Sequence, residues 1–159
     1  PDYTLPKGMP VLEKDLDKFR ERFDMFPREK GPSTKRIMVV DDDPDALALM
    51  DRILSDEGFE LVKVANATEV GLKAVQMTPD LILLDFLMPE INGFEVCAAL
   101  RANELTRSIP IMAVTCLSKE KDIERIFASG ADDYLSKPFK VDNLLAKVRE
   151  LVGKGRNAE

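Results

Sequence analysis

The sequence predicts an α/β fold with a central five-stranded parallel sheet covered by helices, preceded by a helical extension. Two observations lead to this prediction. From residue 36 onward, short apolar runs alternate with segments of helical periodicity. Several of these runs have no polar face, which is typical of strands buried on both sides between two helical layers. Glycine and proline separate many of the segments, as expected where elements end.

The predicted elements follow one another without an internal repeat. The first strand is predicted at Ile37–Val40. Asp43 followed by Pro44 predicts the N-cap and first position of a helix that Gly58 ends. The later segments predict strands at Phe59–Val64, Leu81–Leu84, Ile109–Val114 and Tyr134–Leu135, and helices at Thr68–Met77, Phe94–Ala102, Lys119–Ser129 and Val141–Val152.

Residues 1–34 precede the alternating pattern and predict one amphipathic helix followed by a linker. Apolar residues repeat along one seam of this helix, at Leu12, Leu16, Phe19, Phe23 and Phe26. A helix this short is not stable alone in water, so the seam should be buried. Two interpretations stay open: contact with a second copy or another partner, and docking on the chain's own globular domain. That domain is predicted at 35–155, with a tail at 156–159.

Composition narrows the class of function. The chain of 159 residues has a net charge of −6 and contains no histidine. The missing imidazole excludes histidine-based catalysis and metal binding, and the negative charge argues against direct contact with nucleic acid. No apolar run has the length of a membrane span, so we expect a cytoplasmic protein without membrane contact. Cys97 and Cys116 are both expected as reduced, buried thiols, with Cys97 in the core.

Polar residues collect at the carboxyl ends of the predicted strands. Asp41, Asp42 and Asp43 follow the first strand, Asp85 the third, Thr115 the fourth, and Ser136 and Lys137 the fifth. In a flavodoxin-like (βα)5 three-layer sandwich, with strand order 2-1-3-4-5, these ends meet at one edge of the sheet. Clustered carboxylates suit a hard cation such as Mg²⁺, and a hydroxyl with a lysine suits a phosphoryl group. Asp43 is better placed as a helix cap than as a ligand.

Four motifs, "VVDDDP", "DLILLDFLMPEINGFEV", "IPIMAVTCLS" and "GADDYLSKPF", together resemble the receiver domain of response regulators in two-component phosphorelay signalling. The resemblance covers roughly residues 35–153. It implies that Asp85 is the phosphoacceptor, assisted by Thr115 and Lys137. It also implies that Tyr134 changes position with Thr115 when the switch is activated.

The resemblance further implies a metal site for Mg²⁺, with Mn²⁺ as a substitute. Its ligands would be Asp41, Asp42, Asp85 and the backbone carbonyl of Leu87. A cis peptide bond between Lys137 and Pro138 belongs to the same set of expectations.

The implied function is a phosphorylation-controlled signalling switch that takes its phosphoryl group from a sensor histidine kinase or a histidine phosphotransfer protein. Such a domain is not an enzyme beyond assisting its own phosphorylation and slow autodephosphorylation. Its partner-binding face would comprise the fourth helix, fifth strand and fifth helix. Three kinds of partner could read the signal: a downstream protein, an output domain not contained in this sequence, or a second copy of the chain. The second copy would bind through this face or through the predicted N-terminal helix.

Two other functions could also involve an aspartate after a strand in this kind of fold. A phosphohydrolase of the haloacid dehalogenase type also uses an aspartate after a strand, but it needs a second acid two residues later, where this chain has Leu87. A phosphate-independent pseudo-receiver would have lost part of the acidic set or the lysine. In receivers, the residues two past the acceptor and two past the switch threonine flank the path of the attacking water. Here these residues are Leu87 and Leu117, which cannot position a water by hydrogen bonding, so the resemblance predicts a long-lived phosphoryl group.

Overall fold

The computed structural model describes residues 34–88 and 92–154. The strands in this part are β1 (Arg36–Val40), β2 (Glu60–Val64), β3 (Leu81–Leu84), β4 (Ile111–Thr115) and β5 (Asp133–Ser136). The helices are α2 (Pro44–Asp56), a 3-10 turn η1 (Ala67–Glu69), α3 (Val70–Met77), α4 (Gly93–Ala102), α5 (Glu120–Ala128) and α6 (Val141–Lys154). The predicted N-terminal helix with its seam, and the predicted tail, lie outside the described residues.

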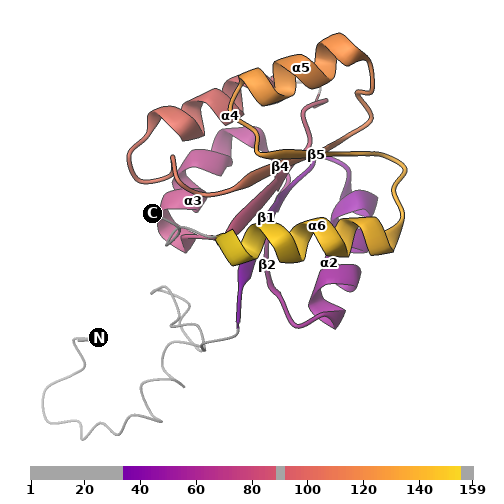
Figure 1. Cartoon of the computed structure of the whole chain (residues 1–159). Coiled ribbons are helices and arrows are strands. Elements are labelled where there is room, and N and C mark those ends of the chain that lie inside the picture. Colours follow the sequence, from indigo (N-terminus) through magenta and orange to yellow (C-terminus); the bar gives the residue numbers. More distant parts are fainter. Residues whose placement is uncertain (1–33, 89–91, 155–159) are drawn as a thin grey trace, which may run out of the picture. The chain divides into compact units, whose positions relative to one another are not determined.

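The five strands form one parallel sheet in the order β2-β1-β3-β4-β5 (Figure 1). This confirms the predicted flavodoxin-like order. β1 lies inside the sheet and pairs with both β2 and β3, so the chain reverses its winding direction at β1. Ligands of open parallel sheets bind at such a switch point, outside the carboxyl ends of the strands.

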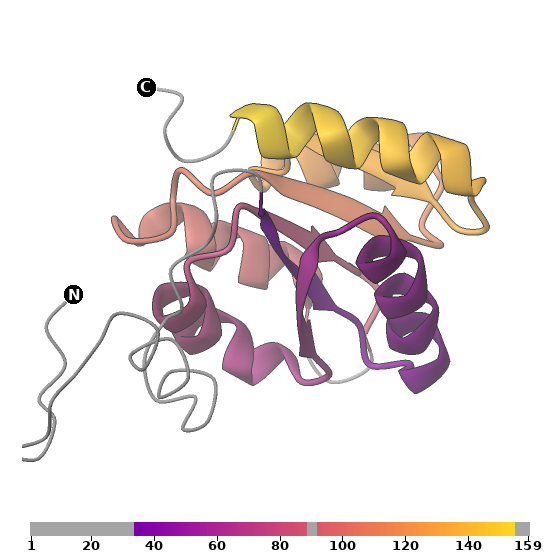
Figure 2. The same cartoon turned by 90° about the horizontal axis from the view of Figure 1, so that it is seen from below.

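Two apolar clusters, one on each face of the sheet, make the core. Within β1, Ile37 and Val39 belong to one cluster and Met38 and Val40 to the other, because successive side chains of a strand point to opposite faces. Residues of α2 and α6 complete the first cluster, and residues of α3, α4 and α5 complete the second. The result is the predicted three-layer sandwich, whose helical layers can be followed in the view from below (Figure 2).

Helix boundaries follow local chemistry. Asp43 caps α2 as predicted, with its carboxylate accepting a hydrogen bond from the Asp45 amide, and Pro44 takes the first helical position. Gly58 lies just beyond the end of α2, at a φ of 91° that other residues rarely adopt. The helix predicted at Thr68–Met77 begins as the 3-10 turn η1, with the Asn66 side chain accepting from the Thr68 amide.

The strand predicted at Ile109–Val114 begins two residues later, at Ile111. Ile109 instead closes a turn through its amide, which donates to the Thr106 carbonyl. Pro110 has no amide hydrogen for the ladder, although its carbonyl accepts from Ile82. β4 extends to Thr115, which pairs with Ser136 of β5. Thr115, which the sequence analysis placed after the strand, is therefore the last residue of β4.

Candidate functional site

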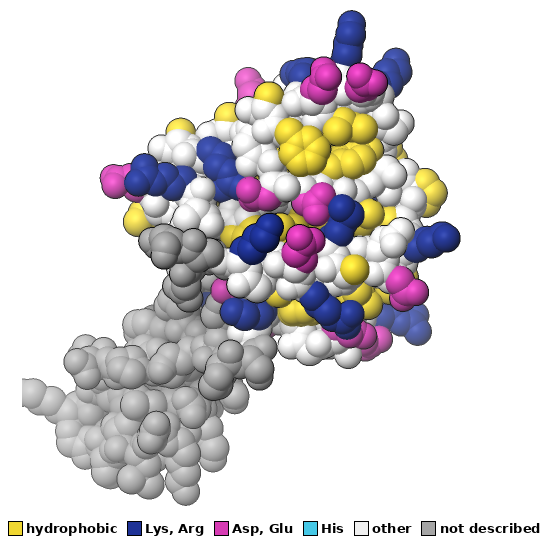
Figure 3. Space-filling view, in the orientation of Figure 1, with side chains coloured by type: hydrophobic (Ala, Val, Ile, Leu, Met, Phe, Trp, Pro, Cys, Tyr) yellow, Lys and Arg dark blue, Asp and Glu magenta, His cyan; other side chains and the backbone are white. Residues whose placement is uncertain are grey.

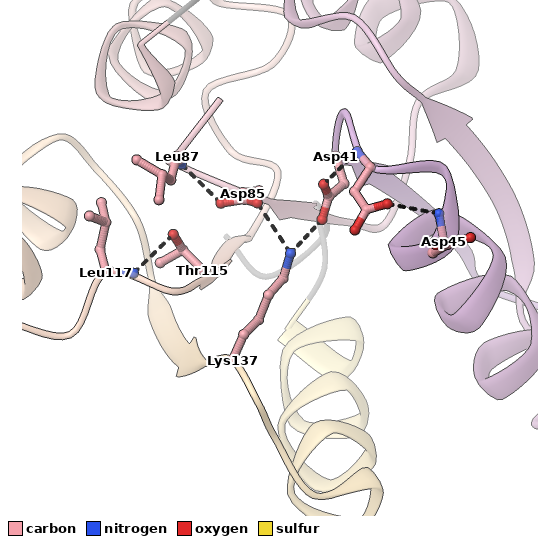
Figure 4. A network of polar contacts seen from close by, with 8 residues as sticks. Asp41, Asp45, Asp85, Leu87, Thr115, Leu117 and Lys137 are labelled. Carbon is pink, nitrogen blue, oxygen red and sulfur yellow. Dashed lines mark hydrogen bonds and ion pairs between the residues drawn. The ribbon is translucent and has the colours of Figure 1, made fainter. Parts of the chain in front are cut away.

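Four strands bring the predicted site residues to one edge of the sheet. Asp41 directly follows β1, Asp85 follows β3, Thr115 ends β4, and Lys137 follows β5. The strands are parallel and in register, so their carboxyl ends lie together. Figure 4 shows Lys137 extending between Asp41 and Asp85, with Thr115 nearby. We call Asp41, Asp42, Asp85, Thr115 and Lys137 the carboxyl-edge site.

Lys137 bridges the two carboxylates. Its Nζ lies 2.6 Å from Asp41 Oδ2 and 3.1 Å from Asp85 Oδ2. Asp41 is 4% exposed and Asp85 8% exposed, so water screens these charges little. Burial by itself would lower the pKa of Lys137, but the hydrogen bond to Asp41 and the negative charges of Asp85 and Asp41 outweigh it and raise the pKa above its usual value. The ammonium group therefore stays charged between its partners.

The acidic side chains exceed the cations that contact them. Oxygen atoms of Asp41, Asp42 and Asp85 lie within 4.8 Å of one another. Lys137 is the cation that reaches Asp41 and Asp85, and Asp42 remains exposed. Two negative charges are thus left uncompensated in this cluster, which favours binding of a divalent cation.

The donor set fits Mg²⁺. The three clustered residues offer only carboxylate oxygens, which are hard ligands, and no thiolate or imidazole takes part. Asp41 also accepts a hydrogen bond on Oδ1 from the Asp43 amide, at 3.0 Å, which orients its carboxylate. Asp43 itself caps α2 and lies outside the acidic cluster, as the sequence predicted.

Thr115 and Tyr134 meet at the backbone of Leu117. The Leu117 amide donates to Thr115 Oγ1 at 3.3 Å, and its carbonyl accepts from the Tyr134 hydroxyl at 2.6 Å. Thr115 is fully buried. A change in the Thr115 hydroxyl can therefore reach Tyr134 through one residue of the loop between β4 and α5.

The loop after Asp85 is tied back to its own strand and to α4. The Leu87 amide donates to Asp85 Oδ1 at 2.9 Å, and Leu87 forms an isolated antiparallel bridge with Asn92. Gly93 packs so closely on Phe86 that a Cβ at this position would lie 2.4 Å from the Phe86 Cα.

Our reading of the sequence overlooked Asn92 and Gly93. Asn92 caps α4, its side chain accepting from the Phe94 amide at 2.8 Å. An asparagine just before a helical pattern is a standard capping signal, so the cap was detectable. The close contact of Gly93 with Phe86 was not detectable, because it depends on how α4 packs on the loop after β3.

Among the remaining expectations, the cis peptide bond and the burial of Cys97 are confirmed, whereas the expected burial of Cys116 is wrong. Lys137–Pro138 is a cis peptide bond. Cys97 is buried in the core and Cys116 is exposed, and both are free thiols. Burial raises the pKa of Cys97, which favours the thiol over the thiolate. No helix in the described part of the chain is both long and apolar enough to cross a membrane.

Comparison with known proteins places this geometry in a family. The profile of the response regulator receiver domain matches residues 37–149. The chain is 42% identical over 117 residues to RpaA of Synechocystis sp., a "DNA-binding dual master transcriptional regulator", covering 74% of this chain and 48% of that protein. It thus spans about half the length of this relative.

Solved structures agree with the sequence match. The CheY-like receiver domain protein from Methanospirillum hungatei superposes with a TM-score of 0.71 at 30% identity, covering 77% of this chain and 96% of that one. The receiver domain of the sensor histidine kinase PA1611 from Pseudomonas aeruginosa gives 0.71 at 29% identity, covering 76% and 99%, and that structure holds a magnesium ion in its active site cleft.

The receiver family supplies regulatory phosphoacceptor domains, which generally bind Mg²⁺ and are not catalytic enzymes. Three observations fit this family: the cluster of acidic residues, the strand order and the profile match over residues 37–149. The chain belongs to the response regulator receiver domain family and takes part in phosphorylation-based two-component signalling.

Proposed function

We propose that Asp85 is the phosphoacceptor of this receiver. The observation that supports this is the position of its carboxylate. Asp85 directly follows the central strand β3 and is largely buried, and its carboxylate lies 3.1 Å from Lys137 Nζ with Asp41 and Asp42 beside it. A carboxylate oxygen of Asp85 attacks the phosphorus of a phosphohistidine, the nitrogen–phosphorus bond breaks, and the imidazole leaves with its electron pair and takes up a proton. The product is an acyl phosphate.

Charge compensation does most of the work in such a transfer. Lys137 contacts both Asp41 and Asp85, so its ammonium group stabilises negative charge on the incoming phosphoryl oxygens. Asp41, Asp42, Asp85 and the Leu87 carbonyl would hold Mg²⁺, which neutralises the transferring oxygens when bound. Thr115 supplies a hydroxyl for a hydrogen bond to the bound phosphoryl group.

Acetyl phosphate provides a direct test. Intact-mass and peptide spectrometry should find one phosphoryl group, on Asp85, only when Mg²⁺ or Mn²⁺ is present. Asp85→Asn should take up none. Asp142→Asn, which alters an exposed aspartate at the start of α6, is a matched control and should label like the wild type. Equal labelling of the Asp85→Asn variant would refute the assignment.

The output of the switch follows from the shared contact at Leu117. When the Thr115 hydroxyl turns to a phosphoryl group on Asp85, its bond with the Leu117 amide changes, and the loop that holds the Tyr134 hydroxyl shifts with it. We therefore place the response at α5, β5 and α6, the partner-binding face. Amide chemical shifts should change there on phosphorylation, and Thr115→Val should weaken these changes. Changes restricted to α2 and α3 would contradict this route.

The exposed face built by α5, β5 and α6 suits a protein partner. Figure 3 shows apolar side chains between α5 and β5, with charges of both signs over β5 and α6. Phe127 is 44% exposed on α5, and Lys147 of α6 pairs with Asp133 of β5 at 2.9 Å. A sensor histidine kinase or a phosphotransfer protein delivers phosphate, and a downstream protein, an output domain or a second copy reads this face.

Sedimentation separates the possible modes of dimerisation. Full-length chain and a 33–159 truncation are compared with and without acetyl phosphate. A phosphate-dependent dimer of both identifies the α5-β5-α6 face. A dimer of the full chain alone identifies residues 1–32, where the sequence predicts a helix, as the dimer contact. Identical monomers in every sample would remove both dimer proposals. Direct contact with nucleic acid is not part of the proposal, in keeping with the net charge of −6.

A further inference from the structure

The start of α4 lies against the loop that follows the acceptor. Gly93 is the first residue of α4, and a Cβ there would lie 2.4 Å from Phe86 Cα, 3.1 Å from Asp85 O and 3.1 Å from Phe86 C. All three neighbours are backbone atoms, which cannot move aside as a flexible side chain can. The close approach of α4 to residues 85 and 86 therefore depends on glycine.

Asn92 ties the next residue of the same loop. Its backbone pairs with Leu87 in an antiparallel bridge, while its side chain caps α4 at the Phe94 amide. The Leu87 amide is at the same time held by Asp85 Oδ1. Leu87 is thus fixed on one side by the acceptor and on the other by Asn92, the residue that caps α4.

Aromatic packing supports this arrangement from outside. Phe86 and Phe94 meet edge to face with ring centroids 5.1 Å apart, and the Arg125 guanidinium lies 4.0 Å above the Phe94 ring. Phe86 is 3% exposed. The loop after Asp85 is therefore held by α4 through the backbone and through side chains.

We infer that Asn92 and Gly93 are positioning residues for the cation, because they fix the Leu87 main chain whose carbonyl is the proposed ligand. This inference rests on the proposed function, since it assigns these residues to the same metal site. Neither residue need touch the ion. Mg²⁺ demands near-ideal octahedral geometry at about 2.0–2.1 Å, whereas Ca²⁺ accepts irregular coordination at about 2.3–2.6 Å. A displaced carbonyl should therefore reduce Mg²⁺ binding more than Ca²⁺ binding.

The experiment compares two glycine substitutions. Gly93→Ala forces the loop and α4 apart, whereas Gly71→Ala, in the first turn of α3, adds a methyl group with no atom within 4 Å. Mg²⁺ and Ca²⁺ affinities of the full chain are measured by calorimetric titration, and folding is checked by urea denaturation. Gly93→Ala should lower Mg²⁺ affinity about 10–100-fold, the range found when groups that orient metal ligands are removed. Ca²⁺ affinity should fall less, and Gly71→Ala should match the wild type.

A milder variant covers the case in which Gly93→Ala does not fold. Asn92→Ala removes the cap of α4 without adding an atom near Phe86, and Asn92→Ser restores a capping oxygen. The alanine variant should weaken Mg²⁺ binding and the serine variant should recover most of it. Equal Mg²⁺ affinity in wild type and all folded Asn92 and Gly93 variants would overturn the inference.

The same titrations distinguish this inference from the proposed function. If the wild type binds no Mg²⁺, or Asp41→Asn binds it equally well, the metal site itself is refuted. If the wild type binds Mg²⁺ through Asp41 but Gly93→Ala loses Mg²⁺ and Ca²⁺ affinity to the same extent, the geometric role of Gly93 is refuted while the metal site stands.

Discussion

Two clusters of charged residues lie at opposite ends of the same sheet. The carboxyl-edge site lies where the strands end. The amino-edge cluster consists of Arg36, Asp80 and Asp132, at or next to the starts of β1, β3 and β5, and of Arg101, near the end of α4. Each cluster contains buried charged side chains, Arg36 and Asp80 at the amino edge and Asp41 and Asp85 at the carboxyl edge. Each also joins segments that are far apart in the chain.

At the amino edge, the charges meet matching partners. Arg101 donates to the carbonyls of Gly130, Arg107 and Ile109 at 2.8, 2.8 and 2.6 Å, and its Nη2 lies 2.6 Å from Asp132 Oδ2. Asp132 also accepts from the Ile111 amide at 2.9 Å. One arginine thus joins the end of α4 to the segments that begin β4 and β5.

Arg36 and Asp80 act in the same way on the other half of the sheet. The Arg36 amide donates to Asp80 Oδ2 at 2.8 Å. Its guanidinium, almost fully buried, pairs with Glu60 of β2 and bonds the Met77 carbonyl at the end of α3. Each residue of this cluster therefore has a hydrogen-bond or ion-pair partner within the fold.

The comparison teaches that burial of charge does not by itself identify a functional site. In the amino-edge cluster each arginine is paired with a carboxylate, Arg36 with Glu60 and Arg101 with Asp132, whereas the carboxyl-edge site sets three carboxylates against one ammonium group. Such an imbalance costs stability and is retained where a ligand supplies the missing charge. The four predictions below test this difference, from the largest expected effect to the smallest.

Replacing Arg101 with alanine should have the largest effect. It leaves Asp132 and three carbonyls without their donor, and we expect a loss of about 2–4 kcal/mol in the free energy of unfolding. Urea denaturation measures this loss. Arg107→Ala, which removes an exposed side chain from the loop between α4 and β4, should change stability by less than about 0.5 kcal/mol. Mg²⁺ affinity should stay unchanged in both variants, and a loss in Arg101→Ala would show that the two clusters are coupled.

Polar residues at the two leucines beside the acceptor should speed loss of phosphate. Leu87 is 56% exposed, and neither it nor Leu117 can orient a water molecule in line with the phosphorus–oxygen bond. Leu87→Asn with Leu117→Glu should accelerate hydrolysis roughly ten- to hundredfold, because one hydrogen bond in a transition state contributes about 1–3 kcal/mol.

Phosphate release from purified protein after removal of acetyl phosphate measures the rate. Leu72→Asn, at an exposed leucine of α3, serves as the control. A wild-type half-life of seconds would contradict the prediction, and so would a double variant that decays no faster than wild type.

Mg²⁺ should stabilise the wild type by compensating the carboxyl-edge charges. A ligand at a hundred times its dissociation constant adds about 2.7 kcal/mol. Asp42→Asn should lose much of this gain, and without Mg²⁺ it should be more stable than wild type by about 0.5–1 kcal/mol, since one repelling charge is gone. Thermal unfolding with and without Mg²⁺ tests both statements. An identical Mg²⁺ effect in Asp42→Asn and wild type would refute the charge argument.

The smallest effect is expected at the contact between α4 and α5. Arg125 lies over the Phe94 ring in an exposed position, and such a cation–π pair contributes about 0.5–1 kcal/mol. A double-mutant cycle with Arg125→Ala and Phe94→Leu isolates this coupling from the loss of each side chain. Lys121→Ala, an exposed cation of the same helix, should show no coupling with Phe94→Leu. If Arg125 also shows none, the pair does not join the two helices.

Much of the fold and the positions of the site residues could be read from the sequence. The apolar runs at β1 and β3, the Asp43–Pro44 start of α2 and Gly58 at its end are local signals, because the period of burial and the chemistry of a cap involve neighbouring residues. The motifs around Asp41, Asp85, Thr115 and Lys137 predicted a single site and membership of the receiver family. The profile match over residues 37–149 confirms the family. The roles of the individual residues stay predictions.

Only the tertiary structure decided which polar groups meet. Lys137 reaches Asp41 and Asp85 across 96 and 52 residues of chain, and Arg101 reaches Asp132 across 31. These distances depend on strand order, register and side-chain direction together. The sequence pattern marks Arg101 only as a charged residue near the end of a helix, and Gly93 only as a glycine. Arg101 bonds backbone carbonyls, and Gly93 packs against the backbone of Asp85 and Phe86. The folding of the chain brings these atoms into contact, so a local sequence pattern cannot predict them.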